Sequence, residues 1–343
     1  MIIQNISTKL NNNTRHNKNL SVLLYFIFLA IMLLQSLNAQ TLKFPDDNGR
    51  HEDADFEAWS LFTHLETEKG LQFGISIFFF TGKVIGIKAS GIYVVVADVQ
   101  KKEYQNFSKI QVPLFSSTTH TVGRLMENYS DNVLERDVKS GLYKVKVDMD
   151  DFSISLKFNS LKKAINIGQL AVGDESFNRA YAIPRGNISA QMLYEGGDYQ
   201  LDGIGIFQHQ WGDKPEQSAL SDIFAIHFKD STDILIYHSD TFPEINTMLI
   251  SNSNGENRIL RKFTATADSI ISDESSNDKF KLDWRFKSPN NQFKIKFSPS
   301  FKGQEIEMLG LSYWLSRCKV VIEKNDGKTT EGIGYVYIGF DGS

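Results

Sequence analysis

One segment combines residue types that could do chemistry. It covers positions 199–215 and reads YQLDGIGIFQHQWGDKP. If it forms a β-strand, alternate side chains share a face, so His209 and Trp211 point the same way. Gly203 and Gly205 lie on that face and leave room for a ligand or for another segment of chain. The pattern predicts a proton-exchanging His beside an indole face, or else a His and a Trp packed at a strand end, which is the commoner meaning of such a pair.

A second polar strand is expected at Asp233–Asp240, which reads DILIYHSD. Tyr237 and Ser239 share one face of this strand, and His238 and Asp240 share the other. The Tyr237 hydroxyl could donate a hydrogen bond or a proton, or the ring could pack while the hydroxyl finds a partner. Spacing alone leaves both interpretations open.

Other catalytic and cofactor motifs are missing from the sequence. It contains no H-E-x-x-H or H-x-H pattern, no cluster of Cys and His, no G-x-S-x-G elbow and no glycine-rich phosphate loop. We therefore expect no metal site and no cofactor. Cys318 is the single cysteine, which excludes an intrachain disulfide. Its alternation with Val320 and Ile322 predicts a small buried side chain.

The N-terminal segment has the pattern of an export signal. Residues 1–20 carry three basic and no acidic side chains, residues 22–34 form an unbroken apolar run, and a cleavage point follows Ala39. The run has 13 residues, fewer than the roughly 20 of a spanning helix. We expect residues 1–39 to be a signal peptide and the mature chain to be periplasmic or extracellular, with an uncleaved N-terminal anchor as the alternative.

The charge of the mature chain argues against nucleic-acid binding. The full chain has 37 Lys and Arg against 41 Asp and Glu, and without residues 1–39 the cations fall to 34, for a net charge of −7. An acidic chain without a basic cluster is a poor partner for a phosphate backbone. No other apolar stretch approaches spanning length, so we expect no membrane span in the mature chain.

Alternation of apolar and polar residues predicts the fold class. It runs through stretches 143–148, 152–158, 280–287 and 293–297, with turn signals such as Asn325-Asp326-Gly327 elsewhere. Helical periodicity is scarce, so we expect an all-β protein of antiparallel meanders, either a sandwich or a barrel. The stretches 73–80 and 92–97 are largely apolar, so these strands should be buried on both faces or line a cavity.

A faint internal echo links the two halves of the chain. Trp59-x4-His64-Leu65 and Asp222-x4-His227-Phe228 each precede a turn and an apolar strand. One such echo could arise by chance, but it would fit two related β units. No low-complexity linker separates the halves, and residues 213–216 are the best candidate for a boundary.

Taken in order, these segments resemble the lipocalin-like family of carotenoid 1,2-hydratases (hydroxyneurosporene synthases) and the related AttH-type proteins. The most specific similarity is GIFQHQWG at 205–212, which resembles the family's W-x-D-H-Q-W-G signature. Looser matches extend over about residues 52–341, at 56–65, 95–98, 224–228, 236–237, 313–314 and 332–340. The resemblance implies two tandem lipocalin-like antiparallel β-barrels, at 40–212 and 213–343, with a pocket for a long apolar ligand.

The resemblance also implies a reaction. The family's hydratases add water to an isolated alkene of an isoprenoid chain, which requires an acid that protonates carbon and water that captures the cation. By motif match, His209, Trp211 and Tyr237 carry over as catalytic candidates. The family's acid falls on Ser239, so Asp240, one position later, could serve only if a bulge turns it round.

Two further positions depart from the family, since Gln208 replaces an Asp and Tyr337 replaces a Glu. Three functions therefore remain open. The first is an exported enzyme that acts on a bulky apolar, isoprenoid-like molecule by hydratase- or isomerase-type acid–base chemistry. The second is a non-catalytic binder or carrier of an apolar ligand, which the loss of the acids favours. The third is a pocket that folds a substrate for cyclisation.

Overall fold

The structure is a computed structural model that describes residues 42–84, 87–111, 118–121, 123–169, 178–213, 222–272, 279–308 and 311–339. The expected signal peptide at 1–39 and most of the expected boundary, residues 214–216, lie outside these ranges. Residues 43–343 form one compact unit. The described helices are short 3-10 turns, and none has the length and apolar character of a membrane span. They are η1 (Asp46–Asn48), η2 (Pro243–Ile245) and η3 (Pro289–Asn291).

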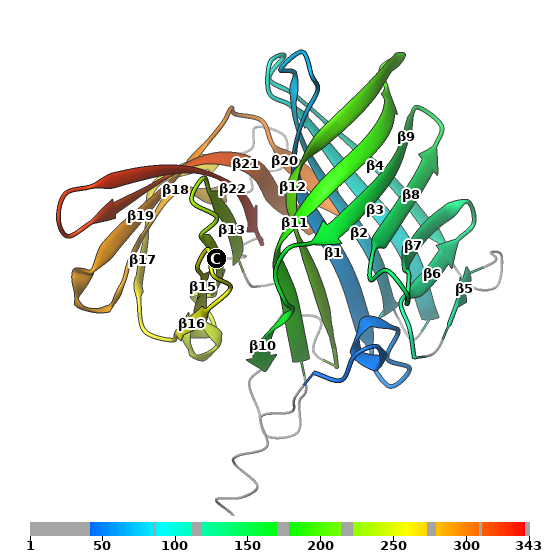
Figure 1. The fold of residues 1–343 in the computed structure, drawn as a ribbon, viewed down its shortest axis with the longest axis horizontal. Coiled ribbons are helices and arrows are strands. Elements are labelled where there is room, and N and C mark those ends of the chain that lie inside the picture. The colour runs from blue at the N-terminus through cyan, green and yellow to red at the C-terminus, as the bar shows by residue number, and fades with distance from the viewer. Residues whose placement is uncertain are drawn as a thin grey trace, which may run out of the picture. The chain divides into compact units, whose positions relative to one another are not determined.

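The first sheet is antiparallel and curls into a barrel, coloured blue to green in Figure 1. Its order is β4-β3-β2-β1-β12-β11-β9-β8-β7-β6-β5, with β10 paired to β11. The strands are β1 (Phe56–Glu66), β2 (Gln72–Val84), β3 (Ile87–Asp98), β4 (Glu103–Gln111), β5 (Thr118–His120), β6 (Met126–Tyr129), β7 (Asn132–Arg136), β8 (Tyr143–Met149), β9 (Phe152–Ser160), β10 (Ile165–Gln169), β11 (Asn178–Tyr194) and β12 (Gly197–Gly212).

The second sheet is also antiparallel and curled, and it runs from green through yellow to red in Figure 1. Its order is β16-β15-β14-β13-β22-β21-β19-β18-β17, with β20 paired to β21. The strands are β13 (Asp222–Phe228), β14 (Asp233–His238), β15 (Thr247–Ser251), β16 (Asn257–Leu260), β17 (Thr264–Ser272), β18 (Lys279–Lys287), β19 (Phe293–Pro299), β20 (Glu305–Met308), β21 (Leu311–Lys324) and β22 (Thr329–Ile338). The expected all-β class with two tandem barrels is confirmed.

The two sheets repeat one strand arrangement. In each, the first strand of the sheet pairs both with the next strand and with the last one, as β1 does with β2 and β12, and β13 with β14 and β22. The registers match as well, because His64 lies opposite Ile204 and His227 lies opposite Ile333. The echo in the sequence therefore marks equivalent positions of a repeated β unit.

Glycines flank both of these partner positions because the strands approach closely there. A Cβ on Gly203 would lie 2.0 Å from the His64 carbonyl oxygen, and one on Gly332 would lie 2.9 Å from the His227 carbonyl oxygen. Real Cβ atoms do not fit at such distances. At Gly203 the room expected from the sequence is thus taken by the backbone of β1, which is another segment of chain rather than a ligand.

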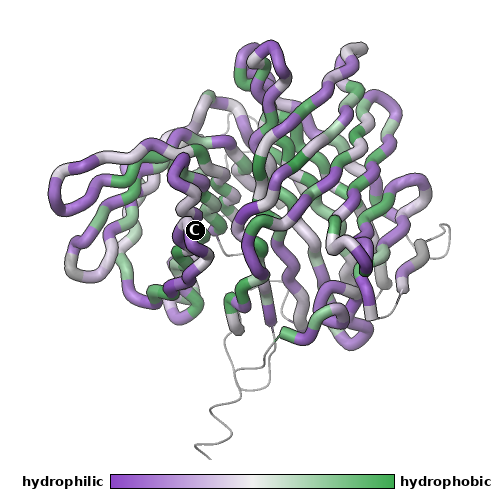
Figure 2. The backbone as a smooth tube through the Cα atoms, viewed as in Figure 1, coloured by the Kyte–Doolittle hydropathy of each residue, from purple (hydrophilic) through white to green (hydrophobic). Residues whose placement is uncertain are grey.

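Side chains alternate between the barrel interiors and a cluster between the sheets. Interior side chains meet across the first barrel, as Phe79 of β2 does with Tyr129 of β6. Phe62 and Phe78 point the other way and belong to a buried cluster with Tyr237 and Tyr335 of the second sheet. Strands β2 and β3 are therefore buried on both faces over their apolar stretches, as expected. Hydropathy alternates along many strands in Figure 2.

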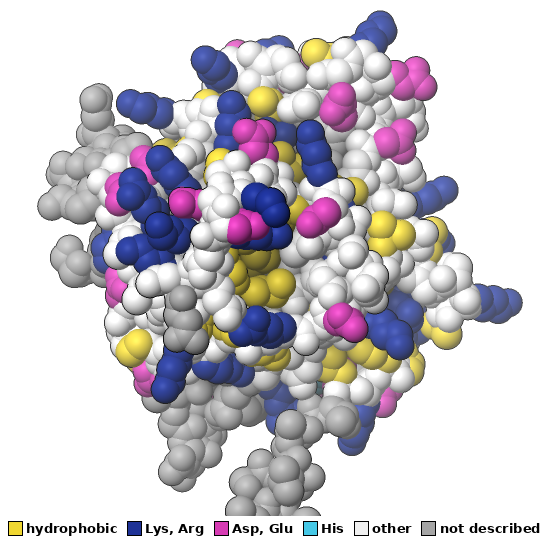
Figure 3. Space-filling model, turned by 60° about the vertical axis from the view of Figure 1, so that its left-hand side comes forward, with side chains coloured by type: hydrophobic (Ala, Val, Ile, Leu, Met, Phe, Trp, Pro, Cys, Tyr) yellow, Lys and Arg dark blue, Asp and Glu magenta, His cyan; other side chains and the backbone are white. Residues whose placement is uncertain are grey.

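The interior of the second barrel is packed with apolar side chains. Phe224, Trp284 and Phe286 lie in this buried cluster, and Cys318 belongs to it too, as the sequence predicted. Burial raises the pKa of the Cys318 thiol to about 12, so it is protonated and unreactive at neutral pH. Figure 3 shows one outer face, where charged side chains are spread widely and apolar side chains gather in a central hollow.

Candidate functional site

His209 and Trp211 lie together inside the first barrel. They follow each other on the inward face of β12, opposite Trp59 and Glu57 of β1. Both are buried, and their ring centroids are 4.8 Å apart. The sequence predicted this shared face. It did not predict the strand pairing, which brings a carboxylate beside them.

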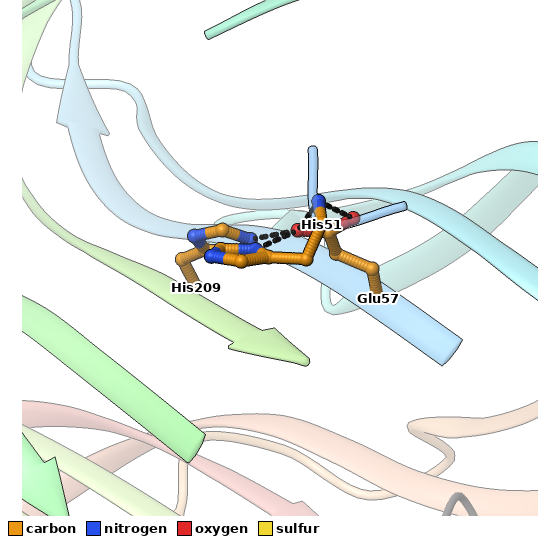
Figure 4. A group of neighbouring side chains, drawn as sticks. All are labelled: His51, Glu57 and His209. Atoms are coloured by element: carbon orange, nitrogen blue, oxygen red, sulfur yellow. Dashed lines mark hydrogen bonds and ion pairs between the residues drawn. The ribbon is translucent and has the colours of Figure 1, made fainter. Parts of the chain in front are cut away.

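Glu57 is that carboxylate, and two imidazoles approach it (Figure 4). Its Oε1 lies 2.8 Å from His209 Nε2 and 2.8 Å from His51 Nδ1. Burial alone would raise the pKa of Glu57, but hydrogen bonds and electrostatic interactions with His209 and His51 outweigh it and lower that pKa. Burial in turn lowers the pKa of His209. His51 and Glu57 went unrecognised because they lie far from His209 in the sequence.

The segment that carries His51 is anchored inside the barrel. Asn48 Oδ1 accepts hydrogen bonds from the hydroxyls of Tyr143 at 3.1 Å and Tyr181 at 2.8 Å. Arg50 pairs with the fully buried Glu127. These contacts anchor residues 48–51 to three separate strands and so hold His51 in place beside β1 and β12.

Tyr237 lies on the opposite side of β12 from His209. It belongs to the cluster between the sheets, where its hydroxyl donates to Gln208 Oε1 at 3.2 Å. Burial raises its pKa. Because Gln208 and His209 are neighbours on a strand, their side chains point to opposite faces, so Tyr237 and His209 do not meet.

Asp240 lies apart from all three other candidates. It follows the end of β14, its side chain is 60% exposed, and its Oδ2 is 2.7 Å from Lys281 Nζ. Burial would raise its pKa, but Lys281 and His238 lower it overall. The four candidates from the sequence therefore occupy three places: the first barrel interior, the cluster between the sheets, and the surface.

A cleft of about 620 Å³ opens between the two sheets. Its walls come from β1, β2, β11 and β12 on one side and from β13, β21 and β22 on the other. Apolar side chains such as Leu65, Ile204, Phe228 and Val320 line it together with His64, His227, Arg185 and Arg317. A volume of this size lies within the range of small-molecule sites.

His227 forms a histidine–aspartate pair at the cleft. Its Nδ1 lies 2.7 Å from Oδ1 of Asp233, the residue opposite it on β14. Arg185 and Lys162 also contact this buried carboxylate, at 2.8 and 2.7 Å. Burial would raise the pKa of Asp233, but His227 and Arg185 lower it, so the group is ionised. An ionised Asp at Nδ1 leaves Nε2 of His227 for the cleft.

His64 faces His227 across the cleft. Their rings meet edge to face with centroids 5.6 Å apart, and the other side of His64 packs on Tyr335. Burial and the nearby charges of His227, Arg317 and Arg185 hold the pKa of His64 well below its usual range, so this imidazole is neutral. Its Nδ1 has no hydrogen-bond partner within the described ranges.

Arg317 of β21 lines the cleft as well, together with Glu66, Gln72, Asp202, Lys229, Lys319 and Glu331. It is 8% exposed, donates to Gln72 Oε1 at 3.2 Å, and pairs with no carboxylate among the residues whose positions are described. Its Nε is buried without a partner in the same part of the chain. A buried guanidinium without an acid is a ready partner for an electron-rich oxygen of a ligand.

Comparison with known proteins agrees with this architecture. The sequence model of the AttH-like family matches residues 35–338. The chain belongs to the AttH-like family. The match confirms the resemblance to AttH-type proteins that the sequence motifs indicated. A search of curated protein sequences finds no match.

Solved structures show the same fold at low sequence identity. A putative AttH protein from Nitrosomonas europaea has a TM-score of 0.74 and 17% identity, over 88% of this chain and 98% of that one. Kievitone hydratase from Nectria haematococca has a TM-score of 0.70 and 14% identity, over 89% and 94%. CghA, solved with Sch210972, has a TM-score of 0.52 and 11% identity, over 89% and 98%.

The sequence contained one signal for the cleft residues. His64 and His227 are the two histidines of the internal echo, and the structure places them face to face. No sequence pattern pointed to Asp233, Arg185 or Arg317 as their partners. Asp233 meets His227 through the pairing of β13 with β14, and Arg185 reaches this pair from the other sheet.

Proposed function

We propose that this AttH-like chain is an enzyme that adds water to a carbon–carbon double bond, or catalyses a related proton transfer, in the cleft between the sheets. The observation that carries the proposal is the His227–Asp233 pair, joined at 2.7 Å, in a cleft that His64 and Arg317 also line. The neighbour kievitone hydratase is named for a hydration, which agrees with this reaction class.

His227 is the proton carrier in this proposal. Asp233 holds its Nδ1–H, so Nε2 is free to accept a proton, and the carboxylate stabilises the imidazolium that forms. Arg185 and Lys162 keep Asp233 ionised and in place. The same pair can return the proton later in the reaction.

Arg317 determines which double bond is suitable. An isolated alkene needs a neutral carboxylic acid to protonate carbon, and Asp233 is held ionised. An alkene conjugated to a carbonyl needs only a base and a cation near the carbonyl oxygen. As water bonds to the β-carbon, His227 takes its proton, the electron pair moves to the oxygen beside Arg317, and the imidazolium then protonates the α-carbon.

The walls of the cleft indicate what the part of the substrate beyond its conjugated carbonyl should be like. Leu65, Phe228 and Val320 offer surface for an apolar body, and polar and charged side chains, among them Glu66, Asp202 and Glu331, line the rest of the cleft. We therefore propose an amphiphilic small molecule with one conjugated carbonyl, a narrower class than the isoprenoid-like ligand expected from the resemblance.

The test is an activity screen with the full chain against apolar α,β-unsaturated ketones and acids. Hydration is followed by the loss of conjugated absorbance and by a mass gain of one water. His227→Asn and Asp233→Asn should each lower the rate at least 100-fold. Asp268→Asn, which alters an exposed pair with Arg285 away from the cleft, is the matched control. A loss of activity in His209→Gln with His227→Asn unaffected would place the chemistry inside the first barrel and overturn the proposal.

A carrier function is the second candidate, because the cleft also fits an unreacted apolar ligand. Native mass spectrometry of the purified chain would detect a ligand that co-purifies. A ligand that stays unmodified after long incubation, with no turnover in the screen, would favour the carrier.

We also propose that the chain is exported. The support is the basic segment at 1–20 followed by the apolar run at 22–34. Mass spectrometry of the protein from its native host should give a chain that starts at Gln40. Recovery of the intact chain from the cytoplasm would contradict export.

A further inference from the structure

We propose that His51, Glu57 and His209 bind a divalent transition-metal ion, with Zn²⁺ as the best fit, inside the first barrel. One donor atom from each residue lies within 4.8 Å of the others. Two imidazoles and a carboxylate form one of the ligand sets that proteins use for catalytic zinc. The site is separate from the cleft and does not rest on the function proposed for it.

The spacing of the donor atoms suits a metal after a small outward movement. His51 Nδ1 and His209 Nε2 each lie 2.8 Å from Glu57 Oε1. Metal–ligand bonds of about 2.0–2.1 Å in tetrahedral geometry place neighbouring donors roughly 3.4 Å apart. Figure 4 shows both rings directed at the same carboxylate, so a shift of about half an ångström opens the position between them.

The hydrogen-bond partners of His209 favour a cation at this position. Its Nδ1 lies 3.0 Å from the backbone carbonyl oxygen of Asp47, which can only accept, while its Nε2 faces the Glu57 carboxylate. A neutral imidazole has a single N–H, so it satisfies only one of these two acceptors. A metal ion between Nε2 and Glu57 satisfies both, because Nδ1–H then donates to Asp47.

His51 also lies between Glu57 and an acceptor oxygen of Asp47. Its Nδ1 faces Glu57, and its Nε2 lies 3.5 Å from Asp47 Oδ1. Metal-binding histidines usually donate their second N–H to a carbonyl or carboxylate, which fixes the tautomer. Asp47 supplies both kinds of acceptor, its carbonyl to His209 and its carboxylate to His51.

Aromatic rings hold the two imidazoles in these orientations. Trp211 stacks on His51 at 4.2 Å, and Trp59 stacks on His209 at 4.8 Å. Trp59 in turn donates its Nε1–H to the Asn48 carbonyl oxygen at 3.2 Å. The side chain of His51 is 19% exposed, whereas those of Glu57 and His209 are buried, so an ion reaches the site past His51.

The experiment uses the full chain purified without an affinity tag that binds metal. Elemental analysis should find close to one zinc per chain. After chelation, Co²⁺ should bind with one equivalent and give the visible absorption of a four-coordinate site. Less than a tenth of an equivalent of both metals, in a chain whose circular dichroism is native, overturns the proposal in favour of two imidazoles that share Glu57 by hydrogen bonds alone.

Variants locate the ion. Glu57→Gln and His51→Asn should weaken Co²⁺ binding at least 100-fold. Asp47→Asn, which changes the outer acceptor of His51 and also the acceptor of the Lys43 backbone N–H, should weaken it by about 10–100-fold. His120→Asn is the matched control, because His120 also contacts a glutamate, Glu52, at 2.5 Å but lies outside the group. His51 is partly exposed, so its variant should stay folded. Equal loss in His51→Asn and His120→Asn would place the metal elsewhere.

Discussion

His64 of β1 and His227 of β13 meet edge to face, with ring centroids 5.6 Å apart, at equivalent positions of the repeated sheet. Among the described residues only His227 has an acidic partner, since Asp233 lies beside it while Gly74 is the residue opposite His64 on β2. The repeat has thus produced two histidines with different hydrogen-bond partners in one cleft. The carboxylate of Asp233 can hold Nδ1–H of His227, whereas Nδ1 of His64 has no hydrogen-bond partner among the described residues.

Removal of the Asp233 charge should destabilise the fold. In Asp233→Asn, the buried Arg185 and Lys162 lose their common counter-ion, and breaking such a buried pair costs about 3–5 kcal/mol. Urea unfolding would measure the loss. Asp268→Asn breaks an exposed pair with Arg285 and should change stability by less than about 1 kcal/mol. Equal stability of the two variants would contradict the conclusion that Arg185 and Lys162 need Asp233 as their counter-ion.

The pKa of His64 gives the stability of the chain a pH dependence. Because burial and neighbouring cations lower this pKa in the folded chain, the unfolded chain binds the proton more strongly. Stability should therefore fall as the pH drops below the ordinary value of 6.5, by at most about 1.4 kcal/mol per pH unit from this group. His64→Gln should flatten that part of a stability curve measured from pH 7 to 5, and an unchanged slope would contradict the assignment.

Arg317 should contribute to ligand binding at a cost in stability. A buried guanidinium without a carboxylate is unfavourable, so Arg317→Met should leave the melting temperature equal or higher. The same variant should lower the activity or ligand affinity of the chain at least tenfold, because the electron-rich oxygen loses its cation. Thermal melts and the hydration screen test both parts. A large drop in melting temperature would show that Arg317 supports the fold instead.

Gly203 should tolerate no side chain. In Gly203→Ala the new Cβ would lie 2.0 Å from the His64 carbonyl oxygen, so β1 and β12 must separate, and we expect a loss of several kcal/mol, about 2–4. Gly82→Ala is the control, because its Cβ would meet its nearest neighbour at an ordinary 3.7 Å. Denaturant midpoints compare the two, and similar values would contradict the close approach of the strands.

The local pattern of apolar and polar residues was sufficient to predict the β-strands of this protein. Alternation predicted the strands, the apolar stretches 73–80 and 92–97 predicted burial on both faces, and Cys318 lies in a core as expected. His209 and Trp211 share a face because side chains in a strand alternate with a period of two. These features depend on residues close in the sequence, so the sequence contains them directly.

The sites depended on contacts that only the folded chain makes. Pairing of β1 with β12 brings Glu57 to His209, and packing of the two sheets brings His64 to His227. The same packing places Tyr237 on the face of β12 opposite His209, although the motif had suggested the two residues together. Strand register and sheet packing depend on the burial of many side chains that lie far apart in the sequence, so a short motif does not predict them. The sequence by itself therefore determined the strands and the family, and the tertiary structure decided which polar residues meet.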